Sequence, residues 1–399
     1  MLACPHHLAL AAALAAASCQ PHVHGQEPTP PRFELAAPPL PVGPMAGLPE
    51  AADVNHDGHL DVVVACGPCC GMDPSPDAGH VQILLGDGAG RLRYAGDAVP
   101  VGETALRVAI GDVNGDGHAD VASIQHSSYD ASVILGDGLG GFATRPDLTF
   151  PLAQGDSPHV HSVTLADVNH DGHLDFLATL ISDHAIAVHL GDGKGHFRPA
   201  LGQPYFAHRH PYEQLTVCDL NGDGHPDLAC TDVRGNGITV LVGSGTGMFA
   251  PSRGFRLEAH TPIAGAERPT ALALGDFTGD GCPDVVATID ESPQVVVLAN
   301  DGHGEFQQVG QEALTTAQPT YGVRVADLNG DGRLDFVTGG AAVSLGHGDG
   351  TFAASRALTG GGTAPQVAIG DFDGDGRPDI VCSSYSDGTV AVLLNRPDQ

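Results

Sequence analysis

The chain has 399 residues, of which 17 are Lys or Arg and 48 are Asp or Glu, so its formal net charge is −31. A surface this acidic repels phosphate backbones and anionic lipid headgroups, which argues against nucleic-acid binding and favours cations as partners. Glycine (55 residues) and proline (30) are abundant, and short β-branched runs bounded by Gly, Asp and Pro recur, which predicts an all-β protein.

Residues 1–19 have the features of an export signal. Residues 8–17 form an apolar run that is too short to cross a bilayer and fits the apolar region of a signal sequence. Residues 16–19, AASC, resemble a bacterial lipobox, in which Cys19 would carry a lipid anchor after cleavage. Plain secretion and a lipoprotein both stay open. No later stretch reaches transmembrane length, and residues 20–31, QPHVHGQEPTPP, are predicted to be a Pro-rich spacer.

A nine-residue acidic phrase then recurs seven times, roughly every fifty residues. It first appears as DVNHDGHLD, beginning at Asp53. All seven copies have Asp at positions 1, 5 and 9 and Gly at position 6. Position 3 is Asn in five copies, Thr278 in the fifth and Asp373 in the seventh. This regularity predicts seven copies of one structural unit.

The spacing of the acidic phrase predicts a Ca²⁺ site. Oxygens at positions 1, 3, 5 and 9, with the carbonyl at position 7, can converge in a loop that turns at the glycine, and Ca²⁺ prefers such flexible all-oxygen coordination. A polar turn closed by Asx hydrogen bonds is the alternative for a single copy, but the sevenfold repetition argues against it. An EF-hand is excluded because position 12 is never Glu and the flanking segments resemble strands.

Up to seven Ca²⁺ ions are therefore expected, bound most tightly by the seventh loop with its four carboxylates and most weakly by the fifth. The predicted ligands are Asp53, Asn55, Asp57, Asp61, Asp112, Asn114, Asp116, Asp120, Asp167, Asn169, Asp171, Asp175, Asp219, Asn221, Asp223, Asp227, Asp276, Thr278, Asp280, Asp284, Asp327, Asn329, Asp331, Asp335, Asp371, Asp373, Asp375 and Asp379.

A second phrase alternates with the acidic one and occurs six times, as LLGDGAGRL, ILGDGLGGF, HLGDGKGHF, LVGSGTGMF, LANDGHGEF and LGHGDGTF. Its glycines supply the positive φ angles of a tight hairpin. A nucleotide-binding loop is excluded because no helix follows. Each period therefore contains four strands, which predicts a seven-bladed β-propeller of four-stranded antiparallel blades.

The seventh blade lacks its outer strand, because the chain ends at VAVLLNRPDQ with Asn395 in the place of the first glycine of the missing turn. Phe33 lies 20 residues before Asp53, in register with the residues that open the other outer strands. We therefore expect residues about 32–42 to complete the last blade, so that the propeller spans residues 32–399. Such closure removes exposed strand edges.

Nine cysteines favour an exported protein. The segment CGPCC, which begins at Cys66, is predicted to be an oxidised loop staple rather than a thiol redox motif, since no helix follows it. If the fourth acidic phrase is a hairpin loop, Cys218 lies opposite residue 228, and Cys230 is its diagonal neighbour on the same face. A disulfide there is geometrically marginal.

With both phrases established, the chain resembles the FG-GAP/VCBS repeat family, whose members are similar to the N-terminal seven-bladed propeller of integrin α subunits. The resemblance covers about residues 32–399. It implies that the D-x-[DN]-x-D-G-x-x-D loops hold structural Ca²⁺ between the first two strands of each blade. Integrins carry such loops in only some blades and recognise ligands together with a β subunit, so their ligand specificity does not carry over.

We expect a monomeric, non-catalytic binding or adhesion module that is exported, either secreted or as a bacterial cell-surface or periplasmic lipoprotein. Its partner would be an extracellular protein or a glycan. No Ser-His-Asp order, Cys-His pairing or carboxylate pair stands out beyond the acidic loops, so we predict no enzyme.

Two alternatives stay open. The first is a carbohydrate-binding lectin or a polysaccharide-lyase-like enzyme, although the absence of Trp argues against a sugar site. Its best candidate region is YFAHRHPYEQ, expected to protrude with Tyr205, Phe206, His208, Arg209, His210, Tyr212 and Glu213. The second alternative is a transition-metal site, because an extended His-x-His pair places two imidazoles on one side. The three such pairs are His22 with His24, His159 with His161 and His208 with His210.

Overall fold

The structure is a computed structural model. It describes residues 31–67, 79–102, 104–126, 128–153, 159–207, 210–251, 260–262, 268–290, 292–310, 314–315, 322–340, 342–362 and 365–397. These residues form β-strands, turns and bends and contain no helix. Nothing in these ranges could therefore cross a membrane as a long apolar helix.

The strands form seven antiparallel sheets, which are the blades of a propeller. Blade 1 holds β3 (Glu50–Ala52), β4 (Asp61–Cys66), β5 (Gly79–Gly86), β6 (Leu92–Tyr94) and β7 (Val99–Gly102). Blade 2 holds β8 (Ala105–Gly111), β9 (Asp120–Gln125), β10 (Asp130–Ile134) and β11 (Leu148–Pro151). Blade 3 holds β12 (Val160–Ala166), β13 (Asp175–Leu180), β14 (Ala185–Gly191), β15 (Phe197–Pro199) and β16 (Tyr205–Phe206).

The other four blades follow in chain order. Blade 4 holds β17 (Thr216–Cys218), β18 (Asp227–Asp232), β19 (Gly237–Gly243), β20 (Phe249–Pro251) and β21 (His260–Pro262). Blade 5 holds β22 (Pro269–Gly275), β23 (Asp284–Ile289), β24 (Gln294–Asn300), β25 (Phe306–Gln308) and β26 (Leu314–Thr315). Blade 6 holds β27 (Val323–Ala326), β28 (Asp335–Thr338), β29 (Ala342–Ser344) and β30 (Arg356–Ala357). Blade 7 holds β31 (Pro365–Gly370), β32 (Asp379–Ser384), β33 (Thr389–Arg396), β1 (Arg32–Leu35) and β2 (Leu40–Pro41).

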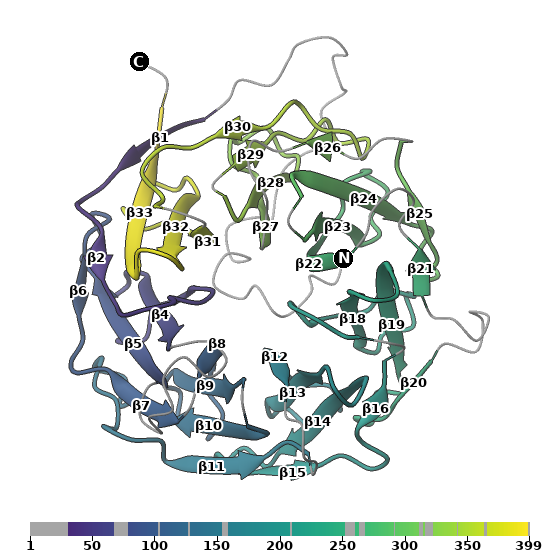
Figure 1. Ribbon diagram of the computed structural model, residues 1–399, viewed down its shortest axis with the longest axis horizontal. Coiled ribbons are helices and arrows are strands. Elements are labelled where there is room, and N and C mark those ends of the chain that lie inside the picture. The colour runs from purple at the N-terminus through teal and green to yellow at the C-terminus, as the bar shows by residue number, and fades with distance from the viewer. Residues whose placement is uncertain are drawn as a thin grey trace.

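The blades are arranged around a central axis, with the first strand of each blade innermost (Figure 1). First strands of successive blades contact one another around the whole ring, from β3 through β8, β12, β17, β22, β27 and β31 back to β3. This arrangement confirms the seven-bladed propeller predicted from the two repeated phrases. In five blades the outermost position is shared by two short strands, both paired with the third strand, as β6 and β7 are with β5.

The N-terminal strand closes the ring as the sequence predicts. β1 pairs antiparallel with β33, so that Phe33 lies opposite Asn395, and β2 pairs with the beginning of β33 at Leu40 and Val390. The seventh blade is therefore built from both ends of the described chain. This pairing covers the edge that β33 would otherwise expose.

The core lies between the blades. Seven apolar clusters are found among the described residues, one at each contact between neighbouring blades. The second strand of every blade is fully buried, as in β4 and β13, because neighbouring blades cover both of its faces. These strands therefore read as nearly continuous apolar runs instead of alternating ones. Every second strand begins with an Asp, which is the last residue of the acidic phrase.

Candidate functional site

All seven acidic loops lie between the first and second strands of their blades, and therefore at one edge of the propeller, which we call the acidic-loop face. The glycine at position 6 has a positive φ in every loop, for example 85° at Gly58 and 84° at Gly376, as the predicted sharp turn requires. Position 4 is also left-handed in every loop. Five loops have Gly there, but the other two have His56 (φ 58°) and His170 (φ 60°). Histidine therefore occupies a backbone conformation that favours glycine at both of these positions.

The side-chain oxygens of each loop are turned inward. The position-1 carboxylate accepts a hydrogen bond from the position-6 amide at 2.7–2.9 Å in all seven loops. The position-5 carboxylate accepts one from the position-7 amide at 2.8–3.0 Å. The loops thus contain the Asx hydrogen bonds of a polar turn. These bonds are compatible with a cation, because a carboxylate can accept about four interactions.

The Asp at position 9 has a structural role that the sequence did not show. Its side chain is fully buried in every loop. One oxygen accepts a hydrogen bond from the position-2 amide of its own loop. The other accepts one from the first residue of the glycine-rich turn or its equivalent, all at 2.7–3.0 Å. In blade 1 these donors are Val54 and Gly86, and in blade 7 they are Phe372 and Asn395. Each of these aspartates therefore fastens the acidic loop to the neighbouring turn.

These buried carboxylates are electrostatically costly. Burial, reinforced by the carboxylates at positions 1 and 5, raises the pKa of Asp61 to about 6, although two backbone hydrogen bonds lower it. The same causes raise the pKa of Asp335 to about 7, and burial together with Asp373 and Asp375 raises that of Asp379 to about 7. A cation in the loop would stabilise the charged form.

The donor set fits Ca²⁺, with differences between loops. In the seventh loop, oxygens of Asp371, Asp373 and Asp379 lie within 4.8 Å of one another, and Asp373 Oδ1 is buried without a hydrogen-bond partner. Arg396 Nη1 lies 2.6 Å from the other oxygen of Asp373, and Arg377 pairs with Asp375. The sequence had not revealed these two neutralising cations.

In the fifth loop, the Thr278 hydroxyl donates a hydrogen bond to Asp284 at 3.1 Å. A hydroxyl held in this way is a poorer ligand than the Asn of the other loops. The carboxylates of all seven loops, with the Asn amides of five of them, nevertheless form a set of hard oxygen donors, which is the chemistry of a Ca²⁺ site.

Neighbouring blades are tied through these loops. The last glycine of a glycine-rich turn donates to the position-2 carbonyl of the preceding blade, as Gly195 does to Val113 at 2.9 Å and Gly247 does to Val168 at 3.2 Å. In blade 7 the side chain of Asn395 makes the equivalent bond, donating to the Leu328 carbonyl at 2.7 Å. Asn395 thus takes the place of the glycine-rich turn in blade 7 and makes the turn's hydrogen bond to the preceding blade. The sequence had placed Asn395 at the first glycine of the missing turn.

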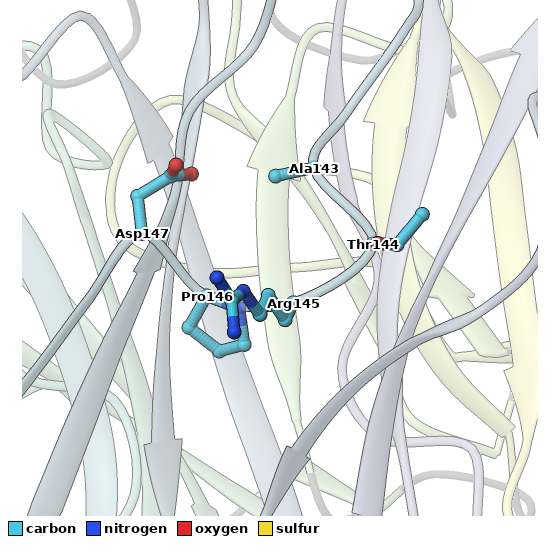
Figure 2. A pocket seen from close by; sticks show the side chains of 5 residues that line it. All are labelled: Ala143, Thr144, Arg145, Pro146 and Asp147. Carbon is cyan, nitrogen blue, oxygen red and sulfur yellow. The ribbon is translucent and has the colours of Figure 1, made fainter.

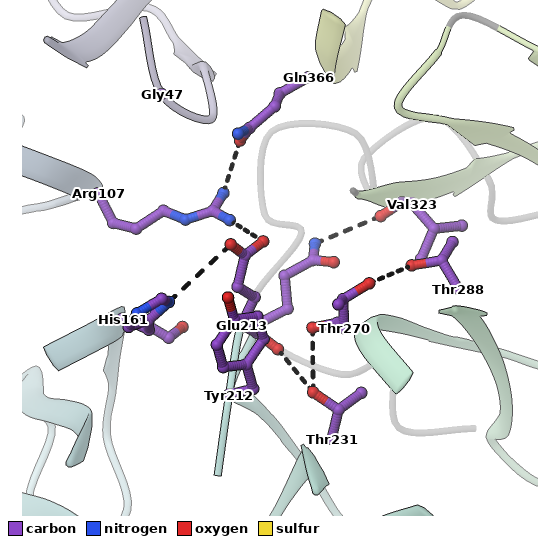
Figure 3. Close-up of polar contacts among 12 residues, drawn as sticks. Gly47, Arg107, His161, Tyr212, Glu213, Thr231, Thr270, Thr288, Val323 and Gln366 are labelled. Atoms are coloured by element: carbon purple, nitrogen blue, oxygen red, sulfur yellow. Dashed lines mark hydrogen bonds and ion pairs between the residues drawn. The ribbon is translucent and has the colours of Figure 1, made fainter. Parts of the chain in front are cut away.

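Polar side chains from five blades lie toward the centre of the ring, each only three to six residues before an acidic loop in sequence. Figure 3 shows three of them, Arg107, Glu213 and Gln366. Arg107 forms an ion pair with Glu213 and donates to Gln366 at 3.0 Å. Arg324 pairs with Glu50 at 2.9 Å. We call these five residues the central polar cluster. Burial raises the pKa of Glu213, although Arg107 opposes this effect.

The segment YFAHRHPYEQ does not protrude as expected over its described residues. Tyr205 is buried, and its hydroxyl donates to the Leu201 carbonyl at 2.7 Å. Tyr212 and Glu213 turn toward the centre of the ring, where Glu213 meets Arg107 (Figure 3). Phe206 is exposed and His210 is half-buried, whereas His208 and Arg209 lie outside the described residues.

A pocket of about 490 Å³ lies at the outer rim of blade 2, between β10 and β11 (Figure 2). It is lined by Ala143, Thr144, Arg145, Pro146 and Asp147. One loop therefore provides its whole lining, with a single basic and a single acidic side chain. Nothing in this set resembles a catalytic or metal-binding group of residues.

The cysteine prediction needs correction. Cys218 pairs with Asp227 and not with residue 228, because Asp227 at position 9 already belongs to the second strand. Cys218 consequently packs between blades 4 and 5, while Cys230 packs between blades 3 and 4. Among the described residues, neither of them forms a disulfide, nor does Cys66, whereas Cys69 and Cys70 lie outside the described residues.

Comparisons with curated proteins identify relatives of part of the chain. It is 30% identical over 212 residues to the T-cell immunomodulatory protein of Rattus norvegicus, which covers 47% of this chain and 33% of the relative. The Mus musculus protein of the same name is 29% identical over 217 residues, with the same coverage. The chain thus spans only about a third of the length of these relatives.

Solved structures share the fold. A lectin of Agrocybe aegerita, described as recognising non-reducing terminal N-acetylglucosamine, superimposes with a TM-score of 0.57 at 22% identity, covering 88% of this chain and 94% of that one. Virginiamycin B lyase of Staphylococcus aureus superimposes with a TM-score of 0.53 at 13% identity, covering 90% and 95%. Proteins with and without enzymatic activity therefore use this architecture.

The model of the FG-GAP-like repeat family matches the chain in six overlapping segments, at residues 53–123, 112–178, 167–230, 219–287, 276–338 and 338–382. The segments begin in an acidic loop or in the strand that follows it, and each ends in the second strand of the next blade. The structure shows this pair of features, acidic loop and second strand, seven times. The chain belongs to the FG-GAP-like repeat family.

Proposed function

We propose that the protein is a calcium-binding β-propeller that acts outside the cell or at its surface as a non-catalytic binding or adhesion module. The observation that carries the proposal is the set of seven acidic loops on one face, each with a buried carboxylate beside two or three others. Calcium in these loops would offset the repulsion of a chain with net charge −31 and make the ring rigid.

The family and its relatives support an extracellular role. The rodent relatives are named for modulation of T cells, which describes an effect on cells and not on a small substrate. The predicted export signal at residues 1–19 agrees with this location. Extracellular Ca²⁺ is abundant enough to occupy even weak oxygen sites.

Two experiments on the predicted leader test the location. Expression of the full-length chain with fractionation of cells and medium tests export, which retention of the protein in the cytosol would contradict. Labelling with a fatty acid, in the wild type and in Cys19→Ser, separates a lipoprotein from a secreted protein. Label that is lost in Cys19→Ser identifies the lipid anchor, and absence of label in the wild type identifies secretion.

The partner class can be determined with arrays. Recombinant residues 32–399 would be applied to protein and glycan arrays in Ca²⁺ and in EGTA, and we expect calcium-dependent binding to an extracellular protein. Saturable binding to one class of glycan would favour the lectin alternative, for which the Agrocybe aegerita fold neighbour is a precedent. Elimination or hydrolysis products from a polysaccharide panel would refute the non-catalytic assignment.

A further inference from the structure

Three histidines meet at the edge of the propeller opposite the acidic-loop face. His126 directly follows β9 of blade 2, and His159 and His161 lie at the beginning of β12 of blade 3. The acidic loops follow the ends of the first strands, whereas these histidines lie where a second strand ends and a first strand begins. Antiparallel pairing therefore places the histidines on the opposite face. Blades 2 and 3 contribute one and two residues, respectively.

The three imidazoles converge through the same ring nitrogen. His161 Nε2 lies 3.0 Å from His126 Nε2 and 2.8 Å from His159 Nε2. The rings are inclined to one another by 51–72°, so they meet at their edges instead of stacking. An imidazole nitrogen carries either one hydrogen or one lone pair, so His161 Nε2 cannot make two good hydrogen bonds. A cation that receives a lone pair from each ring resolves this conflict.

The surroundings keep these imidazoles neutral. His126 and His161 are 8% and 7% exposed, and His159 is half-buried. Burial lowers the pKa of His126 to about 4 and also lowers the pKa values of His159 and His161. Neutral imidazole is the form that binds metal ions.

Neighbouring residues orient His161. Its Nδ1 atom is buried without a hydrogen-bond partner, and the nearest carboxylate oxygen is Glu213 Oε1 at 4.0 Å (Figure 3). The Tyr212 ring packs against the imidazole, with centroids 4.4 Å apart. The negative carboxylate favours a hydrogen on Nδ1, which leaves the Nε2 lone pair directed at the other two histidines. Metal-binding histidines commonly donate this second nitrogen to a carboxylate, and at 4.0 Å Glu213 lies on the right side of the ring but just beyond hydrogen-bond distance.

We propose that His126, His159 and His161 form a three-imidazole site for a divalent transition-metal ion of the Zn²⁺ class. Three nitrogen ligands leave a fourth position for water or for a group from a partner. Ca²⁺ is a poor candidate here because it prefers oxygen ligands. The molecule would therefore bind hard cations on one face and a borderline cation on the other. This inference is independent of the proposed binding function.

The test is a titration of the untagged full chain with Co²⁺ in saturating Ca²⁺, because tetrahedral Co²⁺ absorbs visible light and Ca²⁺ does not. We expect one equivalent of bound Co²⁺, displaced by Zn²⁺. His126→Gln and His159→Gln should each weaken binding at least about 100-fold. His196→Gln is the matched control, since the exposed His196 belongs to a glycine-rich turn, pairs with Asp192 and lies outside the acidic loops. It should leave this binding unchanged.

The fold of each variant is checked by its melting temperature in Ca²⁺. His159 is only half-buried, so His159→Gln provides a test on a folded protein even if His126→Gln unfolds. Absence of a tetrahedral Co²⁺ spectrum in the wild type would overturn the proposal. So would wild-type affinity in a folded His159→Gln variant, or an equal loss of affinity in His196→Gln.

Discussion

Arg107 and Glu213 form an ion pair at the centre of the ring, although they belong to blades 2 and 4 and are separated by blade 3. Arg107 lies on β8, and Glu213 lies just before β17. Their side chains are 5% and 13% exposed. Removing one partner of such a pair is costly, because the other charge stays buried.

We therefore expect Glu213→Gln to lower the free energy of unfolding by about 3–5 kcal/mol. Chemical denaturation in the presence of Ca²⁺ measures this change. Glu34→Gln is the control, because Glu34 pairs with Arg32 where both side chains are about half exposed. That variant should stay within about 0.5 kcal/mol of the wild type. Equal stabilities of the two variants would contradict the importance of the central pair.

Removal of calcium should destabilise the whole propeller. When free Ca²⁺ is at 100 times the Kd of a site, binding at that site adds about 2.7 kcal/mol to the free energy of unfolding, and seven sites act on the same ring. We expect EGTA to lower the melting temperature and excess Ca²⁺ to restore it, with Mg²⁺ much less effective because it requires a stricter octahedron. A melting temperature that is indifferent to EGTA, in protein shown by mass spectrometry to contain no calcium, would refute the calcium assignment.

Two aspartates of the first loop should behave differently. Asp61 accepts hydrogen bonds from two buried amides, so Asp61→Ala should cost about 2–5 kcal/mol even in EGTA. Asp57 is exposed and lies beside other carboxylates, so Asp57→Ala should be nearly neutral in EGTA and destabilising only in Ca²⁺. Thermal unfolding of both variants in both buffers measures the difference. If Asp61→Ala is also neutral in EGTA, the position-9 aspartates do not fasten the turns.

Calcium binding should release protons in mild acid. The pKa of Asp61 is raised from 3.8 to about 6, so the metal-free native state binds more protons than the unfolded state in this range. The stability of the metal-free protein therefore decreases as the pH rises from about 4 to about 7, because Asp335 and Asp379, with pKa values of about 7, lose their protons after Asp61. Ca²⁺ binding should release these protons at pH 6 and far fewer at pH 8. Calorimetry in buffers of different ionisation enthalpy counts them, and equal counts at both pH values would contradict the prediction.

The left-handed position 4 offers a test of backbone strain alone. His170→Gly should stabilise the protein, and Gly330→Ala should destabilise it by about 1–2 kcal/mol. A methyl group at Gly330 would meet no atom within 4 Å, so the cost comes from its φ of 73°. Chemical denaturation in EGTA compares the free energies of unfolding of the two variants without a contribution from the metal. A neutral Gly330→Ala would show that the loop relaxes.

Much of the fold could be predicted from the sequence because the repeated phrases mark the same points in every blade. Asn395 aligned the last blade with the others, and Phe33 then identified the closing strand. The strand pairing of Cys218 was predicted wrongly by one residue, because the sequence alone does not show that Asp227 already belongs to the second strand. His56 and His170 concealed the left-handed position that glycine marks in the other loops.

The centre of the ring and the histidine cluster could not be predicted in full. His159 and His161 share a pattern that suggested a metal site, but their third partner, His126, belongs to another blade. Arg107 and Glu213 are likewise brought together only by the circular arrangement. Spacing along one sequence contains no information about contacts between blades, which depend on how many blades close the ring.

The pairing of β1 with β33 also affects how the protein is made. Residues 32–35 are synthesised before blade 1, whereas their partners at residues 393–396 are synthesised only after blades 1 to 6. Those six blades can form as they emerge, while the first strand must wait without its partner until blade 7 has been made. Closure of the ring is therefore a late step of folding, and the waiting strand is the segment that chaperones have most reason to shield.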